Sequence, residues 1–402
     1  MSQKIKNRAL IITVLGLLTT VGPFSIDMYL PGLGAIAASL GSTIDRVQLS
    51  LTSFFFGIAV GQLIYGPLLD RFGRKPPLVT GLLVYIATSV VLAMAASVEA
   101  LVAWRFVQAL GSCAGMVAAR ALVRDYFPPH ETARVFSLLM LILGVSPVLA
   151  PTIGGYLIHF LGWPSVFITL ALIVAAVLLA VVVLLPEKKG PDASISLRPG
   201  RVLATFGQVA HLPQFAVFAT ASALTSAGLY AWLSGSAFVM MELYGINERE
   251  FGWIFAFLAS GIILASQANN LLLKRYDSVS ISRVAGVWQA LWGVALLGTS
   301  LLPSVSLPMF VALLFLYLLC EGFVFPNTSA LALNPFSRLA GNASALMGAL
   351  QMAVGALASY LTSALFNGTT LPMTAVMAAC SVACCWLILA RGTRMQLVEE
   401  VM

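Results

Sequence analysis

Apolar runs bounded by charges and turn residues recur twelve times along this chain of 402 residues. Each run is long enough for a helix that crosses a bilayer, which takes about 20 residues at about 1.5 Å per residue. The runs lack the alternation of apolar and polar residues that β-barrel strands show. Only 9% of the residues are charged and the mean hydropathy is +0.97, well above that of soluble proteins. The sequence therefore predicts an all-α integral membrane protein with twelve transmembrane helices.

The twelve helices are expected at intervals along the whole chain. The apolar runs cover residues 9–37, 46–69, 77–97, 100–122, 132–160, 163–185, 213–241, 250–273, 281–302, 307–333, 341–366 and 372–391. The first run continues past Asp27, which makes it too long for the apolar core of a cleaved signal peptide. We therefore interpret it as the first transmembrane helix.

One long polar stretch, residues 186–202, interrupts the pattern near the middle of the chain. It is rich in Pro, Gly, Ser and charge, a composition typical of a flexible linker. We expect an N-terminal six-helix bundle over residues 1–187, a cytoplasmic linker over residues 188–212 and a C-terminal six-helix bundle over residues 213–402. A faint repeat supports two halves, because PLLDRFG at residues 67–73 and LLLKRYD at residues 271–277 each follow the second helix of their half. Many transporters are built from such repeats, with the substrate site between them.

Basic residues are distributed unequally between alternate loops. If the N-terminus is cytoplasmic, the inner segments carry Lys4, Lys6, Arg8, Arg71, Arg74, Lys75, Arg120, Arg124, Arg134, Lys188, Lys189, Arg198, Arg201, Lys274, Arg275, Arg283, Arg338, Arg391 and Arg394. The outer segments carry Arg46 and Arg249. Because Lys and Arg collect in cytoplasmic loops, we expect both termini in the cytoplasm. The net charge of +7 then reflects topology, and we expect no nucleic-acid partner.

Three ionisable residues lie well inside the predicted helices: Asp27, Arg105 and Glu321. Counted from basic residues at the inner helix ends, all three lie roughly 25 to 29 Å deep and are expected in one layer. Intramembrane charges usually mark ion or substrate pathways. A guanidinium beside Asp27 would keep the carboxylate ionised and dry surroundings would favour its protonated form, so alternating between them would load and release a proton. Pro23 and Pro31 bracket Asp27, so the first helix is expected to be irregular there.

Each of these residues also has a simpler interpretation. Asp27 and Arg105 could form a fixed structural pair, and Glu321 could simply face water in a cavity. Gln108 shares the helix face of Arg105, where it could orient the guanidinium, touch a substrate or make a polar packing contact.

The segment GPLLDRFGRK, residues 66–75, resembles the loop signature of the major facilitator superfamily, G-x-x-x-D-R-x-G-R-[RK]. The matching residues are Gly66, Asp70, Arg71, Gly73, Arg74 and Lys75. The glycines permit close approach and a tight turn, and the charged groups can bond neighbouring helix ends. Asp125, at the inner end of the fourth helix, is a candidate partner of Arg74. The resemblance implies that this cluster latches an outward-open state, although Lys75 alone could merely set topology.

Two more segments resemble motifs of the same superfamily. LVAWRFVQALG, residues 101–111, is similar to the helix-4 motif L-x-x-x-R-x-x-Q-G, whose arginine is linked to proton transfer, with Ala109 in place of the glycine. GVSPVLAPTIGG, residues 144–155, resembles the helix-5 antiporter motif G-x-x-x-G-P-x-x-G-G, with Ala150 in place of the middle glycine. Its candidate residues are Gly144, Pro147, Pro151, Gly154 and Gly155. They suit close packing or bending against the other half, and the motif favours export over uptake.

Four segments, SIDMYLPG, ARALVRDYF, LYGINEREFGWIFA and VFPNTSALAL, together resemble the bicyclomycin-resistance-type (Bcr/CflA) drug:proton antiporters. The resemblance extends essentially from end to end. It implies a proton-driven exporter of small amphipathic molecules such as antibiotics, in the bacterial inner membrane, that works by alternating access. Asp27 would bind the proton, and Arg105 would tune the affinity of Asp27 for it. Glu321 departs from the subfamily, where a small or amide residue is expected, and this leaves open a changed preference for substrate charge.

Further candidates for the substrate cavity share aromatic, sulfur-containing or polar side chains: Met28, Tyr29, Gln108, Tyr230, Trp232, Glu321, Asn327 and Gln351. Met and aromatic side chains adapt their shape and suit loose recognition, although packing against core or lipid is an equal alternative. We expect a monomer in the bilayer, driven by the proton gradient, with no cofactor and no metal.

Two rival functions are a proton-coupled importer or facilitator of a small metabolite and a membrane-embedded enzyme. The helix-5 motif disfavours the importer, and the direction of substrate movement under a pH gradient would decide. The three histidines, His130, His159 and His211, have no partner at metal-ligand spacing, and the sequence contains no Walker A motif. Neither a metalloenzyme nor direct drive by ATP is therefore supported.

Overall fold

The computed structural model describes residues 8–187, 190–192, 199–302, 305–336 and 339–392, and this part of the chain contains helices and no strand. The long helices are α1 (Arg8–Asp27), α3 (Ile44–Phe72), α4 (Lys75–Ala93), α5 (Val98–Tyr126), α6 (Pro129–Leu161), α7 (Pro164–Leu184), α9 (Pro213–Ala237), α10 (Glu248–Leu272), α11 (Ser278–Thr299), α12 (Leu307–Leu333), α13 (Ala340–Ala364) and α14 (Leu371–Leu387). The short elements are α2 (Leu33–Ser39), α8 (Pro199–Ala210), the 3-10 turn η1 (Leu30–Gly32) and the π-helical turns η2 (Phe238–Leu243) and η3 (Ile388–Gly392). Each predicted apolar run overlaps one of the long helices.

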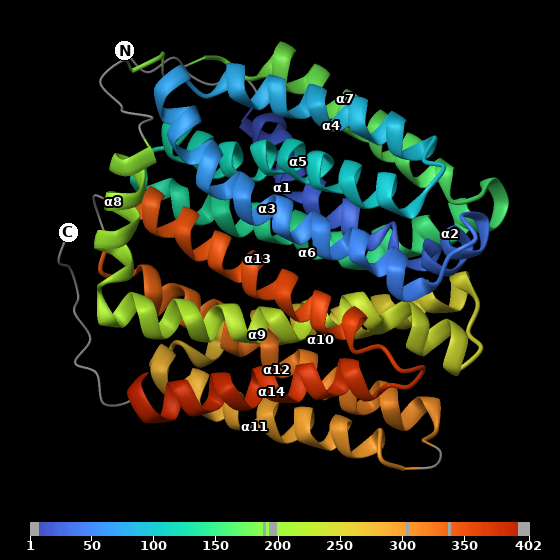
Figure 1. The fold of residues 1–402 in the computed structure, drawn as a ribbon. Helices are drawn as coiled ribbons and strands as arrows, with labels where there is room; N and C mark the ends of the chain where they lie inside the picture. Colours follow the sequence, from blue (N-terminus) through green and yellow to red (C-terminus); the bar gives the residue numbers. More distant parts are fainter. Residues whose placement is uncertain (1–7, 188–189, 193–198, 303–304, 337–338, 393–402) are drawn as a thin grey trace.

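The long helices form two bundles that lie side by side (Figure 1). Helices α1 to α7, drawn in blue to green, form the first bundle, and α9 to α14, drawn in yellow-green to red, form the second. Two helix pairs make the main contacts between the bundles: α3 with α13 and α6 with α10. The predicted architecture of two six-helix bundles is confirmed.

Local chemistry accounts for where many helices begin. Proline occupies the first turn of α4, α6, α7, α9, α12 and α14, where its missing N–H leaves no helical hydrogen bond unmade. Asn247 and Glu250 form a capping box at the start of α10. Asp277 caps α11 by accepting hydrogen bonds from the main-chain N–H groups of Val279 and Ser280. Gly73 ends α3 with a φ of 85°, a conformation that favours glycine.

Eleven helical segments of the described chain are long and apolar enough to cross a membrane. The twelfth long helix is α6, which has 33 residues and contacts α1 in the first bundle and α10 in the second. Peripheral helices carry large apolar side chains on their outer faces; Leu172 of α7 is 66% exposed and Trp288 of α11 is 50% exposed. Such surfaces suit hydrocarbon, where every main-chain polar group must be bonded within the protein. The chain is a multi-pass membrane protein.

Helix α8 lies within residues 188–212, the expected linker, and the sequence does not predict it. Phe206 and Val209 of α8 are buried, and Val209 joins an apolar cluster formed with side chains of α9, α12 and α13. Residues 188–189 and 193–198 of the expected linker lie outside the described residues. In Figure 1, α8 lies at one end of the bundles, on the left, and we call this end the α8 end.

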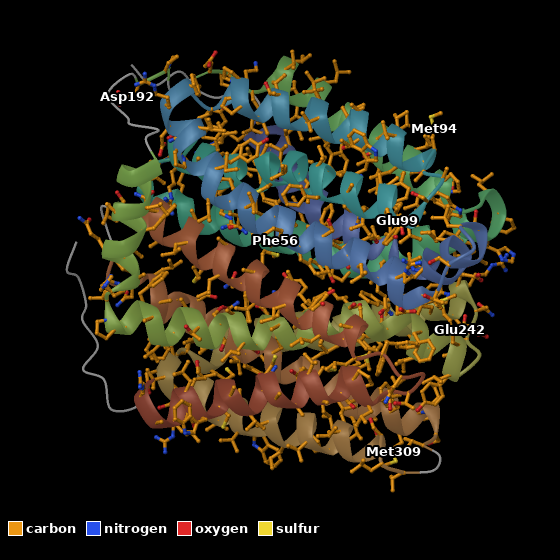
Figure 2. All side chains as sticks on the ribbon, in the orientation of Figure 1. Phe56, Met94, Glu99, Asp192, Glu242 and Met309 are labelled. Carbon is orange, nitrogen blue, oxygen red and sulfur yellow. The ribbon has the colours of Figure 1, made fainter. Side chains whose placement is uncertain are left out.

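Charged residues gather at the two ends of the bundles. The described basic residues toward the α8 end include Arg8, Arg71, Arg74, Lys75, Arg120, Arg124, Lys274, Arg275, Arg283 and Arg391, whereas Arg46 and Arg249 lie toward the opposite end. Figure 2 shows Asp192 at the α8 end and Glu99 and Glu242 toward the opposite end. Glu99 forms an ion pair with Arg46, with 3.6 Å between nitrogen and oxygen. Basic residues are therefore concentrated at one end, as their spacing in the sequence predicts.

Candidate functional site

The first transmembrane helix breaks directly after Asp27. Helix α1 contains Pro23 and ends at Asp27, and Pro31 lies in the 3-10 turn η1 that follows. The N–H of Gly32 donates to the carbonyl of Tyr29 at 3.0 Å, and the chain then resumes as α2. The irregularity predicted from the two prolines is confirmed. It places a carboxyl group at a helix end inside a span of the membrane.

Asp27 is buried, with 5% of its surface exposed, and it faces the boundary between the bundles. Tyr230 of α9, in the second bundle, lies close enough to interact electrostatically with the carboxyl groups of both Asp27 and Glu321. The ring of Tyr230 packs against Phe55 of α3, with 4.5 Å between the ring centroids. Among the described residues, Asp27 has no ion-pair partner. One tyrosine thus lies near a carboxyl of the first bundle and near a carboxyl of the second.

Arg105 of α5 lies inside the first bundle and is fully buried. Its guanidinium donates one hydrogen bond to Oε1 of Gln108 at 2.7 Å and one to the carbonyl of Ser25 at 3.0 Å. It also lies over the rings of Phe54 and Tyr29, with 4.1 and 4.7 Å from the guanidinium carbon to the ring centroids. Buried cations are stable when they are hydrogen bonded and placed against aromatic faces. The arginine therefore fixes the last turn of α1.

The ion pair expected between Asp27 and Arg105 is not formed in this structure. Arg105 instead binds the main chain at Ser25, two residues before Asp27, and the hydroxyl of Ser25 also points into the first bundle, 2.5 Å from that of Tyr85. Side chains two residues apart on a helix diverge by about 200°. Asp27 therefore lies on a different face of α1 from the side chain of Ser25, within electrostatic reach of Tyr230. Counting residues gives the depth of a side chain, but it does not give its direction.

Two partners of the predicted site residues carry no signal in the sequence. Nε2 of Gln108 donates to Oγ of Ser89 at 2.7 Å, and the hydroxyl of Tyr29 lies 2.8 Å from Oγ of Ser50. Single serines are common in transmembrane helices, where they bond neighbouring helices. Gln108 and Tyr29 thus make polar contacts within the first bundle in this conformation.

Glu321 of α12 is the buried carboxyl of the second bundle, with 4% of its surface exposed. Its Oε2 is enclosed and has no hydrogen-bond partner. Besides Tyr230, the groups near enough to interact with it electrostatically are Tyr317, one helical turn away, and Cys384 of α14. A buried carboxyl oxygen without a partner is costly, and such groups in native proteins call for an explanation in function.

The other cavity candidates are buried as well: Met28, Trp232, Asn327 and Gln351. Asn327 donates from Nδ2 to Oδ1 of Asn269 in α10 at 2.7 Å. Gln351 donates from Nε2 to Oγ of Ser222 in α9 at 2.8 Å. Both bonds lie within the second bundle, so these amides are engaged with the protein and not directed at Asp27.

The segment that resembles the antiporter motif lies in α6, which contains Gly144, Pro147, Pro151, Gly154 and Gly155. Gly154 faces the main chain of Met28, where a Cβ would overlap the carbonyl oxygen. Gly155 faces the main chain of Glu248 in α10, where a Cβ would lie 2.5 Å from the carbonyl oxygen. The two glycines therefore bring α6 against the break in α1 on one side and against the second bundle on the other.

The loop between α3 and α4 forms a compact charged cluster. Arg74 donates from Nε to Oδ2 of Asp125 at 2.8 Å and from Nη1 to Oδ1 of Asp70 at 2.6 Å. Lys75 donates to two main-chain carbonyls at the C-terminal end of α7, at 2.9 and 3.1 Å. The structure thus places Asp125 beside Arg74, as the sequence suggests, and fastens the loop to α5 and α7.

Two other residues of this motif reach beyond the loop. The N–H of Asp192 donates to the carbonyl of Arg71 at 3.0 Å, and Nη1 of Arg71 donates to the carbonyl of Asp192 at 3.4 Å. Gly66 faces α13 of the second bundle, where a Cβ would lie 4.0 Å from that of Ala345. The motif therefore lies at the α8 end, where the two bundles meet.

Toward the opposite end, α3 and α13 are joined by hydroxyl and amide groups. Oγ1 of Thr52 lies 2.7 Å from Oγ of Ser359, and Ser363 donates to Oε1 of Gln48 at 3.1 Å. The sequence does not single out these four residues, because isolated polar residues in different helices show no common pattern. Both hydrogen bonds join side chains directly across the boundary between the two bundles.

Buried carboxyl groups are the ionisable acids at the centre of the molecule. The described residues contain no group of three or more His, Cys, Asp or Glu side chains placed to hold a metal ion. The centre holds two buried carboxyl groups, one in each bundle, with a tyrosine near both. A carboxyl in such a place can exchange a proton when its surroundings change.

Comparison with known proteins identifies several similar chains. The family model described as Major Facilitator Superfamily matches residues 15–359. A protein of Haemophilus influenzae named "Bicyclomycin resistance protein homolog" is 32% identical over 94% of both chains. A protein of Bacillus subtilis named "Uncharacterized MFS-type transporter YdgK" is 34% identical over 92% of both. "Multidrug resistance protein MdtL" of Escherichia coli is 28% identical over 94% of this chain and 95% of its own.

A solved structure has a similar fold. The crystal structure of a bacterial homolog of the human lysosomal transporter Spinster, in an inward-facing and occupied conformation, superposes with a TM-score of 0.75 and covers 100% of both chains. Its sequence is 16% identical, so the likeness concerns the fold.

Proposed function

The chain belongs to the Major Facilitator Superfamily and is a membrane transport protein for small molecules rather than an enzyme, and we propose that it exports drugs and similar amphipathic molecules in exchange for protons. The names of its relatives, which refer to bicyclomycin resistance and multidrug resistance, support a drug as the exported molecule. Asp27 is the proposed proton-binding residue. The proposed location is the bacterial inner membrane, as a monomer, with the basic α8 end and both termini in the cytoplasm.

The observation that carries this proposal is the position of Asp27. Its carboxyl is buried at the break in α1, beside a tyrosine of the other bundle and without an ion pair among the described residues. Desolvation favours the protonated form of a carboxyl, and contact with water favours the ionised form. A movement that opens the bundles around Asp27 would therefore change its affinity for a proton. Proton release on one side and substrate release on the other would be coupled through this change.

The contacts of α6 offer a path for the coupling. Gly154 lies against the chain next to Asp27, and Gly155 of the same helix lies against α10 of the second bundle. A rotation of the second bundle that displaces α10 would act on α6 and, through it, on the break in α1. Arg105 supports the same step as a positioning residue, because its hydrogen bond to Ser25 holds the last turn of α1 in place.

The two bundles are the proposed moving units. They correspond to residues 1–187 and 213–402, with residues 188–212 as the connection between them. The cluster of Arg74 with Asp70 and Asp125 is proposed to latch one end point of the movement, because it fastens the α3–α4 loop to α5 at the α8 end.

Glu321 is the proposed determinant of substrate charge. Its carboxyl is buried in the second bundle, and one of the carboxyl oxygens has no hydrogen-bond partner. Tyr230 is close enough to interact electrostatically with both Glu321 and Asp27. A cationic substrate that reached this region would find a carboxyl group in each bundle, and its charge would favour the ionised form of both. The remaining candidates, Met28, Tyr29, Gln108, Trp232, Asn327 and Gln351, would supply adaptable and polar contacts once the bundles open.

The test uses the purified protein in proteoliposomes with an imposed pH gradient. Asp27→Asn is expected to lower gradient-driven export at least tenfold, because the amide cannot bind or release a proton. A second measurement records the protons that the detergent-solubilised protein releases when substrate is added. Wild type should release them and Asp27→Asn should not. Undiminished export by the variant would contradict the proposal.

A matched control and the direction of transport complete this test. Asp45→Asn makes the same chemical change at a partly exposed position in the first turn of α3 and should leave export and proton release unchanged. Movement of the substrate in the direction opposite to that of the protons is the outcome expected of the proposed antiporter. Movement of substrate and protons in the same direction would establish the importer.

A further inference from the structure

The second copy of the loop repeat, residues 271–277, uses its basic residues differently from the first. In the first copy, Arg71 is bonded to the main chain of Asp192, and directly after it Arg74 is paired with two carboxylates and Lys75 is bonded to main-chain carbonyls. In the second copy, Lys274 and Arg275 stand where the first has Asp70 and Arg71, and both are exposed. Neither has an ion-pair partner among the described residues. Two cations are therefore available at the α8 end of the second bundle.

An apolar groove opens beside these cations on the outside of the second bundle. It has a volume of about 550 Å³ and lies between the end of α10, α11 and α12. Leu272 and Tyr276, which flank Lys274 and Arg275 in the chain, line the end of the groove at the α10–α11 loop, and we call this end the mouth. Farther along α11 the walls are aliphatic side chains and the stacked rings of Trp288 and Trp292, whose centroids are 5.8 Å apart. The groove is thus basic at its mouth and apolar along its length.

The dimensions of the groove match one leaflet of a membrane. Along α11 its lining extends from Ser280 to Trp292, about 18 Å of helix at 1.5 Å per residue. Half the hydrocarbon thickness of a bilayer is about 15 Å. The mouth lies at the helix ends, where lipid headgroups are found, and the apolar part lies at the depth of acyl chains.

We propose that this groove binds an anionic phospholipid. One acyl chain lies along α11 against Trp288 and Trp292, and the phosphate of the headgroup is bound by Lys274 and Arg275. Arg283, exposed on the first turns of α11, adds positive charge near the mouth. Asp277, the acid of this loop, accepts hydrogen bonds from the main chain of residues 279 and 280 and is committed to capping α11. The positive mouth disfavours a cationic drug as the occupant.

An occupied groove would support a wall of the substrate region. Cys320 of α12 lines the groove, and its neighbour Glu321 points into the bundle. The bound acyl chain would therefore fill space directly behind the turn of α12 that carries the buried carboxyl.

Native mass spectrometry of the full chain tests this proposal. Delipidated protein in detergent micelles is titrated with dioleoylphosphatidylglycerol or with dioleoylphosphatidylcholine. Wild type should bind the anionic lipid more tightly than the zwitterionic one, by about the factor that Lys274 and Arg275 together contribute. Because a basic residue near an anionic headgroup contributes about fivefold to binding, Lys274→Gln with Arg275→Gln should weaken phosphatidylglycerol binding about 25-fold. The same pair of changes should leave phosphatidylcholine binding unchanged.

A second variant and a control separate the groove from general surface charge. Val284 is 62% exposed and lines the groove, so Val284→Trp should fill it without disturbing the core and weaken the binding of both lipids. Arg391→Gln removes a positive charge at the α8 end outside the groove and should have no effect. An unchanged phosphatidylglycerol affinity in both groove variants would overturn the proposal, as would an equal loss in Arg391→Gln. Displacement of bound lipid by a drug, with a raised KM for export in Val284→Trp, would identify a substrate entrance instead.

Discussion

Gly154 of α6 lies directly against the main-chain carbonyl of Met28, the residue that follows Asp27. The neighbour is backbone, so no rotation of a side chain could make room for a methyl group at position 154. Only glycine allows α6 to lie this close to the break in α1. The motif thus has a physical reason for a glycine at a position that touches neither substrate nor proton.

Gly154→Ala is expected to destabilise the protein and to slow export. The added Cβ would push α6 away from the break, and overpacking of this kind costs about 1–3 kcal/mol. The melting temperature of the detergent-solubilised protein and the rate of export measure the two effects. Gly144→Ala is the matched control in the same helix, because a Cβ there would lie 3.7 Å from Ile263, an ordinary contact. Equal melting temperatures for the two variants would refute the close approach.

Arg105→Lys and Asp27→Asn are expected to have independent effects on stability. Lysine cannot bond Gln108 and Ser25 at once in the geometry of the guanidinium, and the loss of a charged hydrogen bond costs about 1.5–3 kcal/mol. Asp27 forms no ion pair with Arg105 and is linked to it only through the last turn of α1, so the changes in free energy of unfolding of the single variants should add to within about 1 kcal/mol in the double variant. A coupling energy above about 1 kcal/mol would show that the two residues form an ion pair after all.

The helices and the break at Asp27 could be predicted from the sequence because the membrane imposes strict requirements. A span needs about 20 apolar residues, and a carboxyl between Pro23 and Pro31 stands out in such a span. Helix α8 escaped prediction because its 12 residues are amphipathic and too few to cross a bilayer. Its burial depends on side chains of α9, which follows directly, and on those of α12 and α13, which are distant in the sequence.

The partners within the site could not be predicted, because they depend on the directions of side chains around different helices. The depths of Asp27 and Arg105 suggested a pair, but Asp27 faces Tyr230 and Arg105 binds Ser25. Tyr230 was one of several aromatic candidates, and nothing in the sequence places it near both buried carboxyls. Gly355 illustrates the same limit, because its packing against the ring of Tyr230 follows from the approach of α9 and α13.

Glu321→Gln is expected to reduce the export of cationic compounds more than that of neutral compounds. The glutamine keeps the size of the side chain and removes the ionisable group. A cationic substrate would then lose about one charged hydrogen bond, so its export rate should fall about tenfold. The export rate of neutral substrates should fall less than twofold. The melting temperature should not fall, because Oε2 has no partner to lose. Asn327→Ala, which removes the bond to Asn269, is the control that should lower stability without selecting by charge. An equal loss for both classes of substrate would exclude a role in charge selection.

Thr52→Cys combined with Ser359→Cys is expected to form a disulfide between the bundles when an oxidant is added, and this disulfide should stop export. The two hydroxyl oxygens are 2.7 Å apart across the boundary between α3 and α13, so two sulfurs at these positions need only a small adjustment to form a disulfide. If transport requires the bundles to separate here, oxidation should abolish export and a reductant should restore it. Each single cysteine variant controls for reactions of the five native cysteines, of which Cys113, Cys320 and Cys384 are buried. Full export by the oxidised double variant, with the disulfide verified by mass spectrometry, would show that this contact persists throughout the transport cycle and that the bundles move elsewhere.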